Sequence, residues 1–197
     1  MIAQQLYEGI KTGRAAAQGL ITYMRTDSTR ISPLAKNAAA EFIIEEYGEE
    51  YSQIKPDVKP KKANVQDAHE AIRPTDVTRT PESIKKYLSA DQYKLYALIW
   101  SRFVSSQMTP AVFDTVRADI EQNGVKFRAN GSQMKFEGFT KVYKTSSKKK
   151  DNILPELEKG DTVKSDSISP EQHFTQPPAR FTEAALIKWL EENGVGR

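Results

Sequence analysis

The sequence predicts an α+β fold: a mostly helical first part, a small antiparallel β-rich segment and a C-terminal helix. Two observations support this fold class. Up to about residue 110, apolar side chains recur at the 3.6-residue spacing of amphipathic helices. From Val112 the spacing falls to two, and the pairs Asn-Gly at 123–124 and 130–131 favour tight hairpin turns. We therefore expect a helical part, a β-rich segment and a tail that turns helical again, at residues 1–110, 111–170 and 171–197.

The first part contains three predicted elements before residue 50. Residues 1–10 have a helical pattern that continues toward Gly13, and residues 21–25 look extended. A longer helix is predicted to start with Ser32 as N-cap and to stop at Gly48, because proline follows the serine at the first helical position. The apolar residues of this helix keep a 3.6-residue spacing, which predicts one buried face.

A loop and two more helices complete the first part. Residues 52–65 are rich in lysine and proline and predict a surface loop, and a short helical turn is expected in 66–73. Pro81 opens another helix, and residues 90–108 are the longest helix candidate, which Pro110 ends. The aromatic stripe on this longest helix predicts core packing.

The rest of the chain changes character twice. Over 116–120 apolar residues alternate with polar ones, which is typical of a strand with one buried face. Residues 146–151 (SSKKKD) predict a solvated loop, and residues 161–168 predict a further strand. Thr182 is the expected N-cap of a last helix that runs to about Asn193.

The composition is that of a soluble globular protein without cysteine chemistry. Hydrophobic residues make up 38% of the 197 positions and charged residues 28%, and no apolar run is long enough to cross a membrane. The absence of cysteine excludes disulfides, thiolate catalysis and cysteine zinc sites. With His69 and His173 as the two histidines, a histidine metal site is not expected either. The net charge of +3 permits nucleic-acid binding without requiring it.

The stretch TYMRTDS (22–28) concentrates charge and hydroxyl groups around one tyrosine. In an extended segment, Tyr23, Arg25 and Asp27 face one side, with alternate Cα atoms roughly 7 Å apart. A guanidinium favours the phenolate and stabilises charge on a phosphoryl group, so a transesterification site is one interpretation. The other interpretation is that the tyrosine is half-buried and serves only packing, because the Tyr-X-Arg pattern is common. Asp27 would either pair with Arg25 or orient a histidine.

Four stretches taken together resemble the type IA DNA topoisomerase family, and most closely its bacterial members. The stretch ITYMRTDSTRIS (21–32) resembles the active-site motif of that family. Three more stretches match in the same order along the chain: QDAHEAIRPT (66–75), LYALIWSRFVSSQMTPAVFDT (95–115) and HFTQPPARFTEAALIKWLEENGVGR (173–197). The resemblance spans nearly the whole chain, and four ordered matches are not expected by chance.

The resemblance implies an enzyme that relaxes negatively supercoiled DNA without ATP. Tyr23 would attack one strand, form a link to its 5′ phosphate and release a 3′ hydroxyl, and another strand would pass through the gap before religation. Arg25 would contact the scissile phosphate, and His69, with Asp27 as its partner, would lie near the same phosphate. Further DNA contacts are expected from Thr26, Ser28 and Arg197.

The resemblance also implies an architecture, a cofactor and partners. In a toroidal enzyme, residues 1–110 would carry the tyrosine, residues 111–170 would belong to the arch, and residues 171–197 would begin the next helical domain. Mg²⁺ would be held by an N-terminal domain that has no match here, so we expect no metal on this chain, which would be an internal and inactive fragment.

The expected partners are single-stranded DNA and negatively supercoiled DNA, with no membrane, and the expected state is a monomer. The lack of cysteine fits a reducing cytoplasm, and the resemblance implies association with the nucleoid. A different class of function stays open, because the chain would also suit a non-catalytic module that binds single-stranded DNA or docks a partner.

Overall fold

A computed structural model describes residues 1–13, 16–53, 69–144 and 152–195. The chain forms two compact units, Met1–Leu157 and Glu158–Arg197. Helices are followed by a two-stranded antiparallel sheet and then by a C-terminal helix, as the predicted α+β class requires. Most of the expected basic loop at 52–65, and all of the expected loop at 146–151, lie outside the described residues.

The first two helices form where the sequence predicts them. Helix α1 spans Ile2–Glu8 and stops at Gly9, one turn earlier than expected. Helix α2 spans Pro33–Tyr47. The Ser32 hydroxyl accepts a hydrogen bond from an N–H of the first turn of α2, which satisfies one of the donors that a helix start leaves unpaired. Gly48 follows the last residue of this helix, as predicted.

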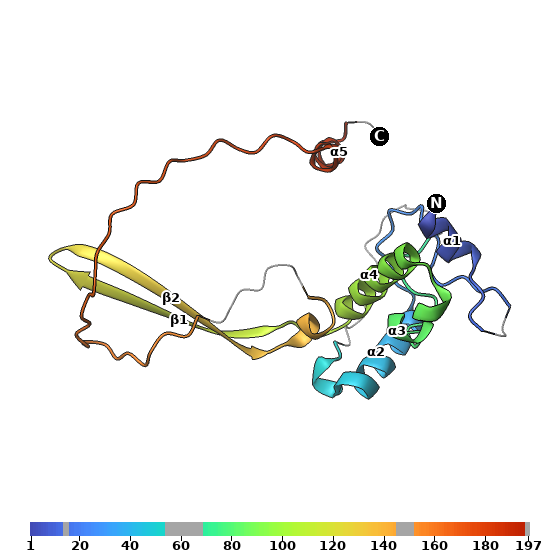
Figure 1. The fold of residues 1–197 in the computed structure, drawn as a ribbon, viewed down its shortest axis with the longest axis horizontal. Helices are drawn as coiled ribbons and strands as arrows, with labels where there is room; N and C mark the ends of the chain where they lie inside the picture. The colour runs from blue at the N-terminus through green and yellow to red at the C-terminus, as the bar shows by residue number, and fades with distance from the viewer. Residues whose placement is uncertain (14–15, 54–68, 145–151, 196–197) are drawn as a thin grey trace. The chain divides into compact units, whose positions relative to one another are not determined.

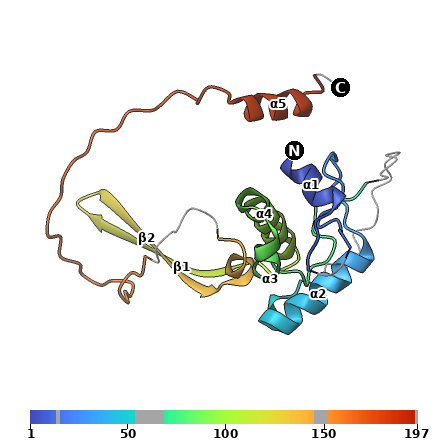
Figure 2. The same ribbon diagram turned by 45° about the vertical axis from the view of Figure 1, so that its right-hand side comes forward.

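Helices α3 (Pro81–Ile84) and α4 (Ala90–Ser106) complete the helical cluster of the first unit. A capping box at Ser89 fixes the start of α4. Figures 1 and 2 show α4 beside α1 and α3, in agreement with the contacts between these helices. On the buried face of α4, the indole N–H of Trp100 donates to the carbonyl of Val77 at 2.8 Å.

The core of the first unit joins α1, α2 and α4 to the segment that precedes Tyr23. Within the core, burial raises the pKa of Tyr96, whose hydroxyl donates to the carbonyl of Arg79 at 2.7 Å. The largest fully buried aliphatic side chains are those of Leu6, Leu20, Ile21, Ile43 and Val104. Because Leu20 and Ile21 are among them, the core holds the chain directly before Tyr23.

The β-rich segment is an antiparallel hairpin of β1 (Val112–Gln122) and β2 (Val125–Phe136). The two residues between the strands, Asn123 and Gly124, have φ values of 52° and 79°. These left-handed values are those that a type I′ hairpin turn needs, so the first predicted turn is confirmed. Most side chains of both strands are exposed.

The second predicted turn, at Asn130-Gly131, is wrong. Both residues lie inside β2 and pair with β1. A bridge between Ser132 and Asn152 brings a third segment against β2. A Cβ at position 131 would lie 2.9 Å from Leu154 and 3.0 Å from the carbonyl of Asn152, so the glycine serves this close approach and not a turn.

The second unit contains helix α5 (Glu183–Glu192), which begins at its predicted N-cap, Thr182. The strand expected over 161–168 is not formed, and its side chains are exposed. In the described residues it has no strand to pair with, and a lone strand is not stable without a partner. Among the helices of the described residues, none has the length and apolar character needed to span a membrane.

Candidate active site

Tyr23 follows a short segment that the core holds in place. Leu20 and Ile21 are each 1% exposed, and Ile21 forms an isolated antiparallel bridge with Pro74. The expected extended conformation is confirmed at this bridge but is wrong further on, because the chain bends at residues 24–25. The alternation of faces expected for residues 23, 25 and 27 therefore does not apply beyond Tyr23.

Thr22 ties the tyrosine segment to residues 71–73. Its N–H donates to the carbonyl of Arg73 at 2.9 Å. Its hydroxyl donates to the carbonyl of Ala71 at 2.7 Å and accepts the N–H of Arg73 at 3.0 Å. A helical turn is expected over 66–73, but the described residues of this range form no helix. The reason is that backbone groups of Ala71 and Arg73 bond to Thr22 instead. The bonds fix the loop that carries His69 relative to Tyr23.

Tyr23 contacts two other rings at the site. Its ring centroid lies 5.1 Å from that of His69, with the planes tilted by 45°. The ring of Tyr7, from α1, lies 5.5 Å away and meets Tyr23 edge to face at 67°. Tyr23 is half-buried, and the other two side chains are exposed. The fold therefore brings together a phenol that can attack a phosphate and an imidazole that can form hydrogen bonds through its ring nitrogens.

The loop after Tyr23 presents hydroxyl groups in fixed positions. The N–H of Ser28 donates to the hydroxyl oxygen of Thr26 at 3.0 Å, and the N–H of Arg30 donates to that of Ser28 at 3.2 Å. Each hydroxyl retains a proton that it can donate to a phosphate oxygen. Arg25 and Asp27 are exposed in the same loop. A guanidinium and two hydroxyl donors thus follow the tyrosine directly along the chain.

An ion pair braces the loop that carries His69. The Nε of Arg73 donates to Oε2 of Glu70 at 2.8 Å, and the Nη2 atom lies 2.7 Å from the same oxygen. Partial burial raises the pKa of Glu70, but hydrogen bonds from Arg73 and Ser32 and the positive charges of Arg73 and Arg30 outweigh this effect. The net result holds the pKa of Glu70 below its usual value, so the carboxylate is ionised at neutral pH.

Sequence reasoning identified Tyr23 and His69, and the structure brings these two together. Sequence reasoning missed Tyr7, whose ring contacts Tyr23, and it missed Thr22 and Arg73, whose hydrogen bonds brace the loop that carries His69. Thr22 could have been noticed in the sequence, because it places a hydroxyl directly after the apolar residues that precede Tyr23. Tyr7 lies in an ordinary helical pattern and gives no such signal. The partnership of Asp27 with His69 stays a prediction. Arg197 lies outside the described residues.

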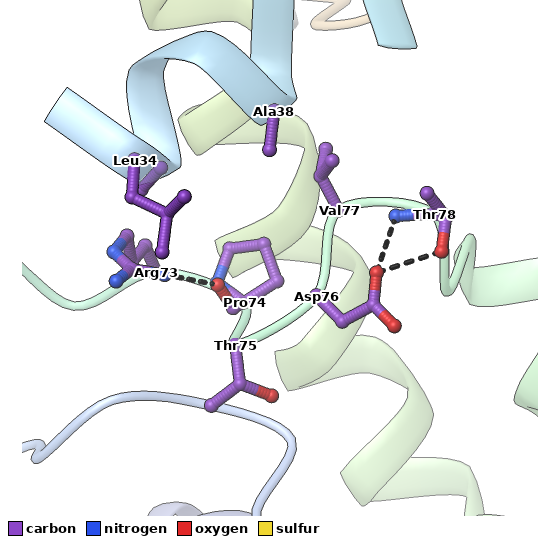
Figure 3. A pocket seen from close by; sticks show the side chains of 9 residues that line it. Leu34, Ala38, Arg73, Pro74, Thr75, Asp76, Val77 and Thr78 are labelled. Atoms are coloured by element: carbon purple, nitrogen blue, oxygen red, sulfur yellow. Dashed lines mark hydrogen bonds between the residues drawn. The ribbon is translucent and has the colours of Figure 1, made fainter. Parts of the chain in front are cut away.

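A pocket near this region is lined by the start of α2 and by residues 73–78 (Figure 3). Its volume of 220 Å³ is below the roughly 300–1,000 Å³ of typical small-molecule sites. The polar groups that line this pocket form hydrogen bonds within the protein. Nη1 of Arg73 donates to the carbonyl of Pro74, and Oδ1 of Asp76 accepts from the N–H and hydroxyl of Thr78. We therefore assign no ligand to this pocket.

The magnesium ion that the resemblance implies is expected on residues outside this chain, and that expectation stays a prediction. Within the described residues, no three side chains of His, Cys, Asp or Glu gather closely enough to hold a metal. A magnesium ion needs oxygen ligands in near-octahedral geometry, usually from one or two carboxylates with water and phosphate.

Comparisons with known proteins bear on the whole chain. A family model described as DNA topoisomerase matches residues 1–197. The structure of full-length topoisomerase I from Thermotoga maritima, in a monoclinic crystal form, is similar, with 42% sequence identity and a TM-score of 0.79. The match covers 100% of this chain and 31% of the Thermotoga chain, so this chain spans about a third of the length of that relative.

Proposed function

The chain belongs to the DNA topoisomerase family, in its bacterial type IA branch, and from this premise we propose that Tyr23 is the nucleophile of an enzyme that relaxes negatively supercoiled DNA. The enzyme cuts one strand, passes another through the gap and reseals the cut. One observation carries the proposal. Two distant parts of the sequence bring the rings of Tyr23 and His69 within 5.1 Å, beside a loop with an exposed guanidinium.

In the proposed reaction, the phenolic oxygen of Tyr23 attacks the scissile phosphorus. A bond from phosphorus to the tyrosine oxygen forms while the bond to the 3′ oxygen of the neighbouring nucleotide breaks. The phenol loses a proton and the departing oxygen gains one, which leaves a 3′ hydroxyl and a 5′ phosphate linked to the protein. Because one phosphodiester replaces another, resealing is the reverse reaction and needs no ATP.

The neighbouring side chains assist the charge changes of this step. An ordinary tyrosine has a pKa of about 10, so only about one in a thousand is a phenolate at pH 7. The guanidinium of Arg25 stabilises the negative charge of the transition state. His69 donates a hydrogen bond to the same phosphate, and Asp27 orients its imidazole. Further DNA contacts come from Thr26, Ser28 and Arg197.

In the complete enzyme, Mg²⁺ would be held by residues outside this chain and would supply positive charge to the reaction. Our proposal includes a consequence for the 197 residues alone. They carry the nucleophile and part of the cationic environment, so by themselves they do not relax DNA. The enzyme works as a cytoplasmic, nucleoid-associated monomer.

A plasmid relaxation assay tests the proposal. With Mg²⁺, the complete product of the gene should relax negatively supercoiled plasmid, and its Tyr23→Phe variant should not. The variant should still bind single-stranded oligonucleotide, because the substitution removes one hydroxyl and no positive charge. The isolated 197-residue chain should be inactive in the same assay. Relaxation by the Tyr23→Phe variant would exclude Tyr23 as the nucleophile.

The second candidate function, a non-catalytic module for single-stranded DNA, is favoured by the exposed cations Arg25 and Arg30 in the loop after Tyr23. Such a module binds phosphates with an affinity that falls steeply as salt rises. It predicts that wild type and Tyr23→Phe bind oligonucleotide equally and that neither changes plasmid topology. Relaxation that depends on Tyr23 would rule it out.

A further inference from the structure

We propose that Tyr7 is a positioning residue for Tyr23. Its ring holds the ring of the nucleophile in the orientation from which the hydroxyl reaches the phosphate, and the inference rests on the proposed function of Tyr23. The two rings meet edge to face, with centroids 5.5 Å apart and planes at 67°. This is an arrangement that aromatic pairs prefer, because the positive edge of one ring faces the negative face of the other.

The backbone of α1 is fixed against the segment that carries Tyr23. The N–H of Leu20 donates to the carbonyl of Leu6 at 2.7 Å, and these two side chains are 1% and 0% exposed. Gly19 permits the approach, because a Cβ there would lie 2.5 Å from the carbonyl oxygen of Tyr7. Tyr7 therefore extends from a backbone that packing holds, although its own side chain is 41% exposed.

Tyr23 has ring contacts from two separate segments. Tyr7 reaches it from α1, and His69 reaches it from the loop that Thr22 ties down. A half-buried tyrosine with one ring contact can change its side-chain rotamer more easily than one with two. A nucleophile misplaced by about 1 Å can lose on the order of 100-fold in rate. Loss of the Tyr7 ring should therefore slow cleavage and leave DNA affinity nearly unchanged.

Single-turnover cleavage of a labelled single-stranded oligonucleotide by the complete gene product tests this role. Tyr7→Leu should lower the saturated cleavage rate by about 10-fold to 100-fold, with the dissociation constant for the oligonucleotide unchanged. Tyr7→Phe keeps the ring and should restore the wild-type rate. A weaker affinity with an unchanged saturated rate would show that Tyr7 binds DNA. An equal loss of rate in Tyr7→Phe would assign the role to the hydroxyl. Either result overturns the inference.

A second measurement does not depend on catalysis. In the 197-residue chain with ¹³C-labelled tyrosine rings, the Tyr23 resonance is identified by its loss in Tyr23→Phe. It should move in Tyr7→Leu, which removes a neighbouring ring current, and stay in place in Tyr7→Phe. An unmoved resonance in Tyr7→Leu contradicts the inference. If wild type forms no adduct at all, the proposed function fails and takes this inference with it. An active wild type that is indifferent to Tyr7→Leu rejects this inference alone.

Discussion

The Tyr23 site and the β1–β2 hairpin are held together in opposite ways. At the site, residues far apart in sequence meet: Thr22 bonds to Ala71 and Arg73, and the preceding residues are almost wholly buried. The hairpin pairs residues that are close in sequence around one tight turn, and most of its side chains are exposed. The fixed geometry of the site thus depends on long-range packing, whereas the hairpin needs only a turn and a ladder.

The largest expected effect is on the free energy of unfolding, when the same substitution, valine to alanine, is made in each of the two regions. Val104→Ala removes two buried carbon groups from the core, where Val104 is 0% exposed. It should lower the free energy of unfolding by roughly 2–3 kcal/mol, from lost burial and the cavity left behind. Val116→Ala in β1, where the side chain is 55% exposed, should cost less than about 0.5 kcal/mol. Urea unfolding of the chain measures both, and equal losses would contradict the contrast.

The next effect concerns the hydrogen bonds between distant segments. Thr22→Val keeps the shape of the side chain but leaves the carbonyl of Ala71 and the N–H of Arg73 without the hydroxyl. We expect a loss of about 1–3 kcal/mol in unfolding free energy, the usual cost of unsatisfied polar groups. Thr22→Ser retains the hydroxyl and is the matched control. If the valine variant were as stable as the serine variant, the bonds would not fix the site.

A smaller effect is expected at the hairpin turn. Gly124 has a φ of 79°, so Gly124→Ala should cost about 1 kcal/mol through left-handed backbone strain. Hydrogen exchange should become faster at the amides of β1 and β2 and stay unchanged at the N–H of Thr22. Gln122→Ala, an exposed change one residue before the turn, should alter neither. Faster exchange at Thr22 would show that the two regions are coupled.

The smallest effect is a pH dependence at Glu70. Because the pKa of Glu70 is lowered in the folded chain, the carboxylate contributes stability above its unfolded pKa of about 4.3. That contribution is lost as the pH falls through the lower folded value. Glu70→Gln should therefore lower stability by less than about 1 kcal/mol at pH 7, and the difference from wild type should shrink below about pH 4.3. Glu45→Gln, on the exposed side of α2, is the control; a difference that grew on acidification would contradict the sign.

Local signals predicted most of the fold. Ser32-Pro33 and Thr182 begin helices because their hydroxyls satisfy neighbouring backbone N–H groups, which is a property of a few consecutive residues. The same locality explains the confirmed turn at Asn123-Gly124. Asn130-Gly131 carries the same signal, but there the approach of residues 152–154 decides the conformation.

The candidate site was predictable only in part, for the same reason. Motif resemblance selected Tyr23 and His69, but no local pattern links them to Tyr7, because that contact depends on how α1 packs against Leu20. The bend at residues 24–25 was missed as well. The hydrogen bonds that hold the site join Thr22 to backbone groups 49 to 51 positions away, which periodicity cannot detect.

The most direct test of the central claim is the chemical identity of the DNA–protein link. The complete gene product is incubated with Mg²⁺ and a single-stranded oligonucleotide that carries labels of different colour at its two ends, and the reaction is stopped with denaturant. After proteolysis, mass spectrometry should find a 5′-phosphotyrosyl nucleotide on Tyr23, and only the 3′-end label should remain with the protein. A link to another residue, a link through a 3′ phosphate, or an undiminished adduct in Tyr23→Phe would contradict the account.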